Sequence, residues 1–276
     1  MLIDCFPYFN ERELLELRLK MHYDRFDLFV ITEGTRTHRG IPKPLSAYNV
    51  IKDAGIPLTK IELVKVEMPS SEEEPENWVR ERMQRDAATG YINDNDIAFV
   101  SDCDEIIDPV IVDELVEYTQ NNPKSLLRVP LVYLLGDARF RVYKEEKIEL
   151  WPSPFMCTNN HLKKYTLSQI REDQAKNLHE IKDFQEVFPV INGNQIRDAG
   201  WHFAWMGGPI KRHMKFKTFL HDDEYYMMEN YVPSEGNTDP LGRGLHILRN
   251  YPMENLPKKI FELENVRKFL LPDEIR

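Results

Sequence analysis

Short apolar runs alternate with segments of helical periodicity through the first half of the chain. Four apolar or β-branched runs predict strands, at residues 1–6, 26–32, 60–66 and 97–100. Three segments between them carry apolar residues at helical spacing and predict helices, at residues 14–21, 47–54 and 78–92. Strands that alternate with helices are typical of a mostly parallel sheet flanked by helices, so the pattern predicts an α/β fold.

Some helix boundaries and faces are also indicated by particular residues. Asn10 followed by Glu13 predicts a capping box at the start of the first helix. In the third helix, Met83 belongs to the stripe that is expected to face the core. Asp108 before Pro109 is typical of a helix start, with the acid as the cap and proline at the first helical position, so we assign Asp108 to capping.

The second half of the chain has a less regular pattern. Residues 153–186 mix polar and apolar positions without a period, and they predict no particular element. With 276 residues and 42% hydrophobic content, we expect one domain whose halves are residues 1–135 and 136–276. Other segments predict a strand at 126–135, an antiparallel pair within 139–151, a loop at 231–244 and a terminal helix at 261–271.

A cluster of carboxylates follows the predicted strand at residues 97–100, formed by Asp102, Asp104 and Glu105. Ligands of open α/β sheets bind at the carboxyl ends of the strands, so acids at this place are candidates for chemistry. Asp102 and Asp104 are two residues apart, which puts them on the same side of an extended segment. They can therefore share one divalent cation, which takes oxygen ligands and often bridges to phosphates.

Two further polar groups accompany the predicted sheet. The strand that ends at Glu33 leads into a polar loop with His38 and Lys43, which is either a solvated surface loop or a ligand-binding one. Arg82 and Arg85 lie together on the helix before the acidic strand. These arginines either pair with surface acids or form a fork of donors aimed at a diphosphate.

An aromatic run far downstream holds a third group of candidates. Residues 200–208 include Trp201, His202 and Trp205 and end in a Gly-Gly pair. A histidine among aromatic residues is usually a hydrogen-bonded core residue. A second acidic cluster at residues 221–224 also makes His202 a candidate metal ligand.

Charge and cysteine content exclude several classes of protein. A formal charge of -10 argues against nucleic acid as a partner, because a phosphate backbone needs a basic surface. Cys5, Cys103 and Cys157 have neither disulfide-framework nor zinc-site spacing, which favours a reducing, cytoplasmic setting. No apolar run reaches the length of a membrane span or a signal peptide, so we expect at most peripheral contact with a membrane.

The ordered set of these motifs resembles glycosyltransferase family 17. That family includes the enzyme that adds the bisecting β1,4-linked N-acetylglucosamine to N-glycans. The resemblance extends from Cys5 to about Glu224, and an Asp-x-Asp alone would be much less specific. The matching residues are Cys5-Phe6, Phe9-Asn-Glu11, Glu33, Thr37-His-Arg-Gly40, Lys43, Glu81, Arg82, Arg85, Asp102-Cys-Asp-Glu-Ile106 and Gly200-Trp-His202.

The resemblance implies a GT-A fold. It also implies that a sugar is transferred with inversion from a nucleotide-sugar. The first choice for the sugar is N-acetylglucosamine, and the first choice for the donor is a UDP-sugar. Residues 1–135 would bind this donor, and residues 136–276 would bind a glycan or glycolipid acceptor. The cofactor would be Mn²⁺ or Mg²⁺, held by Asp102, Asp104 and His202. The membrane anchor of the Golgi relatives has no counterpart here, so we expect a cytoplasmic protein. The implied donor-binding residues are Glu33, His38, Lys43, Arg82, Arg85 and Asp102, and the acceptor-binding ones Trp201 and Trp205.

Direct inverting displacement also needs a base that deprotonates the acceptor hydroxyl. Glu105, Asp223 and Glu224 are the candidates, and the residues alone do not choose among them. A metal-dependent phosphohydrolase would also use paired aspartates, but its usual motif has Thr or Val where this chain has Ile106. A non-catalytic glycan-binding protein that stacks sugars on Trp201, Phe203 and Trp205 is the second alternative.

Overall fold

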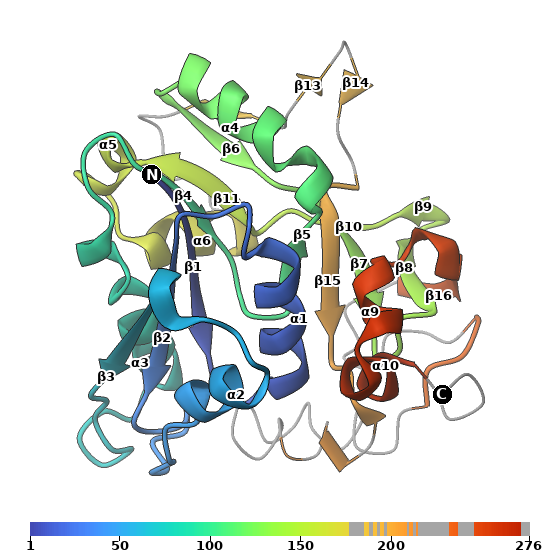
Figure 1. The fold of residues 1–276 in the computed structure, drawn as a ribbon, viewed down its shortest axis with the longest axis horizontal. Helices are drawn as coiled ribbons and strands as arrows, with labels where there is room; N and C mark the ends of the chain where they lie inside the picture. Colours follow the sequence, from blue (N-terminus) through green and yellow to red (C-terminus); the bar gives the residue numbers. More distant parts are fainter. Residues whose placement is uncertain are drawn as a thin grey trace.

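A computed structural model describes residues 1–176, 185–187, 190–191, 194–195, 198–208, 210–211, 214, 232–236 and 246–271 (Figure 1). Within these residues the chain forms two large mixed sheets and a small two-stranded one. The first large sheet has the strand order β12-β6-β11-β4-β1-β2-β3. The second has the order β16-β8-β7-β15-β5, with β10 beside β7 and β9 beside β8.

The centre of the first sheet confirms the strands predicted for the first half of the chain. These four strands run parallel, so their carboxyl ends meet at one edge of the sheet. They are β1 (Leu2–Tyr8), β2 (Leu28–Gly34), β3 (Ile61–Val66) and β4 (Ile97–Val100). Three more strands complete the sheet: β6 (Ser125–Arg128), the antiparallel β11 (Phe155–Thr158) and β12 (Gln185–Val187).

Apolar side chains cover both faces of this sheet. Phe6 and Tyr8 of β1 pack in one core cluster with leucines of α1, whereas Ile3 and Cys5 pack in another with Ile170 of α6. Burial on both faces explains why the inner strands are apolar runs without alternation.

Among the described residues, no helix combines the length and the apolar character that a membrane span requires. The helices around this sheet are α1 (Arg12–His22), α2 (Ala47–Asp53), α3 (Asn77–Asp86), α4 (Val112–Asn121), α5 (Asn159–Leu162) and α6 (Leu167–Lys176).

The second sheet is built largely from short strands of the second half of the chain. Its strands are β5 (Glu105–Ile107), β7 (Leu131–Leu135), β8 (Phe140–Lys144), β9 (Lys147–Ile148), β10 (Leu150–Trp151), β15 (Gly200–Ala204) and β16 (His246–Asn250). The antiparallel pair expected within 139–151 is present as β8 and β9. The small third sheet pairs β13 (Val190–Ile191) with β14 (Asn194–Gln195). The architecture confirms the expected α/β, GT-A-type fold, with a mostly parallel central sheet and a more irregular carboxyl-terminal half.

Strands cross between the sequence halves. β11 and β12 come from beyond residue 136 and join the first sheet, while β5 and β7 come from before it and join the second. The strand predicted at 126–135 is in fact two strands, β6 and β7, in different sheets. Pro130 lies between them and has no N–H to donate to a ladder, so the chain changes sheet there.

Three other predictions for the helices are wrong in detail. The proposed capping box does not form: the side chain of Glu11 instead accepts hydrogen bonds from the N–H groups of Phe9 and Asn10. The terminal helix is divided at Leu263 into α9 (Lys258–Glu262) and α10 (Glu264–Leu270). The third helix ends at Asp86, with a separate turn of 3₁₀ helix near Tyr91.

The buried face of α3 is polar, contrary to the predicted apolar stripe. Met83 is 38% exposed, and the buried residues are Arg80, Gln84 and Arg85. The amide of Gln84 donates to the backbone carbonyls of Tyr8, at 2.9 Å, and of Thr32, at 2.8 Å. α3 therefore packs beside strand carbonyls that need donors, and hydrogen bonding decides its orientation there.

Candidate active site

The acidic residues lie on a loop that carries the chain from β4 in the first sheet to β5 in the second. Arg18 of α1, which is fully buried, fixes the path of this loop. Its guanidinium donates to the carbonyl oxygens of Asp102, at 2.7 Å, and Glu105, at 2.9 Å, and to Ser101 Oγ, at 2.7 Å. Asp4 of β1, also fully buried, balances its charge through two hydrogen bonds.

Asp102 is held by two arginines from different helices. Arg85 Nη2 of α3 lies 3.1 Å from Asp102 Oδ1, and Arg171 Nη2 of α6 lies 2.5 Å from Asp102 Oδ2. Partial burial by itself raises the pKa of Asp102, but the positive charges of Arg171 and Arg85 outweigh it. The pKa therefore lies well below its usual value, and the carboxylate is ionised at neutral pH.

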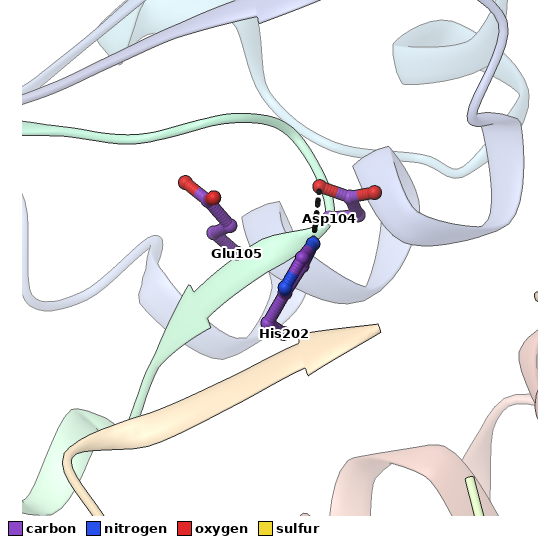
Figure 2. A group of neighbouring side chains, drawn as sticks. All are labelled: Asp104, Glu105 and His202. Carbon is purple, nitrogen blue, oxygen red and sulfur yellow. Dashed lines mark ion pairs between the residues drawn. The ribbon is translucent and has the colours of Figure 1, made fainter. Parts of the chain in front are cut away.

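Asp104 faces the second sheet and meets the histidine of β15. Asp104 Oδ1 lies 3.7 Å from His202 Nε2. The dashed line in Figure 2 marks this ion pair. Glu105 completes a group whose ligand atoms all lie within 4.8 Å of one another. In Figure 2 the carboxylate of Glu105 points away from the other two side chains. Asp104 and His202 are therefore the pair that faces a common space.

The carboxylate of Glu105 is engaged in hydrogen bonds within the protein. Its side chain is fully buried and accepts from Arg171, from the N–H of Asp102 and from the indole N–H of Trp151. Trp151 also lies with its ring centroid 4.5 Å from that of His202, and Tyr133 stacks on His202 at 5.2 Å. Glu105 thus orients the groups around the site, including the aromatic rings that hold the imidazole.

These side chains line a cavity of about 460 Å³ at the carboxyl edge of the first sheet. Charged and polar groups form one part of its wall, and aromatic rings form another. The lining residues include Phe9, Glu11, His38, Trp78, Glu81, Gln84, Arg85, Asp102, Asp104, Tyr133, Trp151, Arg171, Glu172, His202, Ala204 and Trp205. A cleft of this size and chemistry is what a substrate site requires.

His38 belongs to the polar wall and is neutral at neutral pH. Burial lowers its pKa, although Glu81 and Gln84 oppose that effect. The amide of Gln84 uses both N–H bonds on backbone carbonyls, so its oxygen faces His38 Nε2 at 3.4 Å. That oxygen can only accept, so Nε2 carries the proton.

Several residues predicted from the sequence lie away from the cavity. Glu33 accepts from Lys43 and from the first N–H groups of α2, so it caps that helix. Arg82 pairs with Glu172 on α6, on the outer side of α3. Trp201 is buried on the opposite face of β15 and donates to the carbonyl of Asn255. None of these four predicted residues lines the cavity, and Asp223 and Glu224 fall outside the described residues.

Arg18 and Arg171 contribute to the site and were missed by the sequence reasoning. Arg171 lies in the stretch 153–186, for which no element was predicted. Leu167 and Ile170 are buried at helical spacing in that stretch, and this pair is the signal that indicates a helix there. Arg18 carries no such signal, because an arginine on an amphipathic helix normally lies at the surface.

The arrangement fits a divalent cation at Asp104 and His202. Two ligands of one ion bind at roughly 2.0–2.3 Å and so lie about 3–4 Å apart. The distance of 3.7 Å between Asp104 Oδ1 and His202 Nε2 is compatible with that geometry. A carboxylate with an imidazole is also a donor set that divalent transition metals accept. Glu105 and Asp102 are already hydrogen-bonded to arginines, and they fit a metal less well.

The solved structures that match this chain include the following three, all at low identity. Glucosyl-3-phosphoglycerate synthase from Mycobacterium tuberculosis, in complex with Mn²⁺, UDP and phosphoglyceric acid, has 11% identity and a TM-score of 0.43 over 91% of this chain and 87% of its own. A galactosyltransferase with donor and acceptor sugar analogues has 12% identity and a TM-score of 0.36 over 85% and 84%. 4-Diphosphocytidyl-2C-methyl-D-erythritol synthase has 13% identity and a TM-score of 0.41 over 70% and 90%. Likenesses this distant carry nothing about activity.

Sequence comparison is more specific. No curated protein matches the chain. The family model of glycosyltransferase family 17 matches residues 1–136. This range includes the strands β1 to β4 and the acidic loop, together with Arg18 of α1 and Arg85 of α3. This match confirms the resemblance drawn from the motifs: residues 1–136 are similar to glycosyltransferase family 17, and the protein is a glycosyltransferase.

Proposed function

We propose that this protein transfers a sugar, with N-acetylglucosamine the first choice, from a nucleotide-sugar to a hydroxyl of a glycan or glycolipid, assisted by Mn²⁺ or Mg²⁺. One observation carries the proposal: the Asp104–His202 pair and the two arginines, Arg85 and Arg171, line the same cavity. The pair suits a cation, and guanidinium groups suit a diphosphate. These are the two kinds of group that a departing nucleoside diphosphate needs.

The charge of the cavity supports a role for the cation. Its described wall has more carboxylates than arginines, so a diphosphate alone would be repelled. When bound, a divalent cation neutralises charge on the departing phosphate. The carboxylates in the wall are those of Glu11, Glu81, Asp102, Asp104 and Glu172.

Arg85 and Arg171 replace the pair Arg82 and Arg85 as the proposed diphosphate ligands. Both are less than a tenth exposed, both line the cavity, and both donate to Asp102. Asp102 fixes their guanidinium planes before the donor arrives, which reduces the cost of ordering them on binding. In this proposal Asp102 serves the donor indirectly, and Asp104 serves the cation.

Glu172 is the proposed base. Among the cavity carboxylates, Asp102 and Glu81 are paired with buried arginines, and Glu11 holds two backbone N–H groups beside α1. Glu172 pairs with Arg82, whose side chain is 35% exposed and has room to turn away. Glu172 and Arg171 both line the cavity, so an acceptor hydroxyl at Glu172 would share it with the departing phosphate.

The acceptor is proposed to be neutral. A cavity with an excess of carboxylates repels an anionic acceptor. Aromatic rings such as those of Trp78 and Trp205 offer flat apolar faces to sugar rings. These features support a sugar acceptor over a phosphorylated one.

A binding panel tests the proposal. Thermal unfolding is measured with UDP, GDP, CDP and UDP-N-acetylglucosamine, each with Mn²⁺, Mg²⁺ or EDTA, and UDP release from the sugar nucleotide is followed in parallel. We expect uridine ligands to raise the melting temperature only with a cation, and a tenfold excess over Kd stabilises by about 1.4 kcal/mol. Equal stabilisation in EDTA would remove the cation from the proposal, and no response to any nucleotide would refute it.

A further inference from the structure

Side chains alternate along β15 as they do in any strand. His202 and Ala204 line the cavity, while Trp201 and Phe203 lie in the core on the opposite face. Continued alternation would turn residue 205 to the core face, beside Phe203. Trp205 instead lines the cavity together with His202 and Ala204.

A left-handed backbone conformation produces this change of side. Trp205 has φ of +58°, directly after the last residue of β15. Such a conformation costs free energy for any residue with a side chain and is rare for a bulky one. The other non-glycine residues with positive φ in the described chain are Asn95, Glu145 and Glu146, which lie in turns.

Turning the chain does not require a tryptophan at this position. Gly207 and Gly208 follow closely and also have positive φ, so glycine is used for the same purpose nearby. Trp205 is only partly buried, at the edge of a small core cluster that includes Tyr133 and Leu135. Strain that is kept in a bulky residue at a cavity wall, where glycine would allow the same turn, indicates a use for the side chain.

We propose that the left-handed turn presents the indole of Trp205 as a stacking platform for a pyranose ring of the donor or the acceptor. The ligand class rests on the function proposed above; the geometry belongs to the chain itself. Trp205 follows His202 by three residues and lines the same cavity, so a sugar on its ring shares that cavity with the Asp104–His202 pair. An apolar sugar face and an aromatic face exclude water from each other and attract electrostatically.

Three variants separate binding from structure. Trp205→Asn removes the ring but keeps a residue that tolerates the left-handed conformation. Trp205→Phe keeps a smaller ring and serves as the conservative rescue. Trp201→Phe is the matched control, because it changes a tryptophan of the adjoining strand β15 that lies in the core.

Each variant is measured in three ways. Calorimetry with Mn²⁺ compares UDP-N-acetylglucosamine with UDP, so that the ratio of the two affinities isolates the donor sugar. N,N′-diacetylchitobiose is titrated with and without UDP, and this isolates an acceptor-like sugar. Urea unfolding reports stability.

We expect Trp205→Asn to lose roughly tenfold in affinity in one of the two sugar measurements, to keep its affinity for UDP, and to unfold no more easily than the wild type. The measurement that changes identifies the ring as that of the donor or of the acceptor. Trp205→Phe should recover part of the loss, and Trp201→Phe should bind both sugars as the wild type does.

The proposal is overturned if Trp205→Asn keeps both sugar affinities, or if it loses stability and UDP affinity together as a packing residue would. It is also overturned if neither sugar adds to binding in the wild type. In that last case, normal Mn²⁺-dependent binding of UDP would leave the proposed donor site standing. If the wild type does not bind UDP but binds chitobiose, and Trp205→Asn weakens that binding, only the proposed donor is refuted.

Discussion

The two sides of the acidic loop treat its carboxylates differently. On the arginine side, formed by α1, α3 and α6, protein cations approach Asp102 and the loop backbone. On the histidine side, formed by β7, β10 and β15, Asp104 meets an imidazole that packs against the rings of Tyr133 and Trp151. The first side supplies its own positive charge, and the second offers ligands to a cation from solution.

The spacing of Asp102 and Asp104 in the sequence therefore does not by itself assign their roles. The i, i+2 relation predicts that Asp102 and Asp104 share one ion. The loop between the sheets turns sharply, with the N–H of Glu105 donating to the carbonyl of Asp102, so the segment is not extended. The two carboxylates therefore meet different partners, and we assign the cation to Asp104 with His202.

The largest expected effect concerns the base on the arginine side. Glu172→Gln should lower the rate of UDP release from UDP-N-acetylglucosamine with Mn²⁺ by about 10²- to 10⁴-fold, because proton transfer is lost. UDP affinity should stay unchanged. Glu11→Gln, which changes another carboxylate of the cavity wall, is the control. A full loss with Glu11→Gln and none with Glu172→Gln would exchange the two roles.

A structural test of the arginine side is the replacement of Arg171. Arg171→Met should lower the free energy of unfolding by about 3–5 kcal/mol, because the buried carboxylate of Glu105 loses its charged partner. Arg12→Met removes an exposed pair with Asp53 and should cost less than about 1 kcal/mol. Urea titrations of both variants measure this. Similar small losses of unfolding free energy in the two variants would show that the pairing of Arg171 with Glu105 contributes little to stability.

The division of roles between the two aspartates is tested by metal binding. Asp104→Asn should weaken Mn²⁺ binding in the presence of UDP by roughly 100-fold or more, since even indirect partners of metals often account for 10- to 100-fold. Asp102→Asn should weaken it less than about tenfold. The spin-resonance signal of free Mn²⁺ gives both affinities. The reverse order would return the cation to Asp102.

The smallest expected effect is the pH dependence of Asp102. Its pKa is lowered in the folded protein, so the unfolded chain takes up the proton first as the pH falls below about 3.9. The stabilisation by Asp102 is therefore complete above that pH and decreases as the pH falls towards the folded-state pKa. Its side chain is 33% exposed, so screening limits the effect to about 1 kcal/mol.

Urea midpoints at pH 6 and pH 3 measure this dependence in the wild type and in Asp102→Asn. The wild type should lose more stability than the variant between these values, so that their difference narrows. Asp113→Asn, which changes an exposed acid, should follow the wild type. A difference that stays constant or widens towards pH 3 would contradict the assigned shift.

The central strands of the first sheet and the acidic loop could be predicted from the sequence. β1, β2 and β4 are buried on both faces, so each is an apolar run that polar segments delimit, whereas β3 lies at the edge of the sheet and is only partly buried. The loop is recognisable because carboxylates follow such a run directly. Asp102, Asp104, His38, Arg85, His202 and Trp205 were all named from the sequence, and all line the cavity.

Partners across the sheets could not be predicted in this way. Arg171 is 69 residues from Asp102, and Arg18 is 84 residues before it, yet both contact the loop. Local periodicity carries no information on such pairs. For the same reason Glu105 was among the candidate bases, although Arg171 and Trp151 engage its carboxylate in the folded chain.

By itself, the sequence determined the α/β class, the position of the acidic loop and the family of residues 1–136, because these depend on local patterns and ordered motifs. Only the tertiary structure decided the partners of each carboxylate and the side of β15 on which Trp205 lies. Charge pairing depends on distances between segments far apart in the chain, and the turn at Trp205 depends on a backbone angle that strand alternation does not predict.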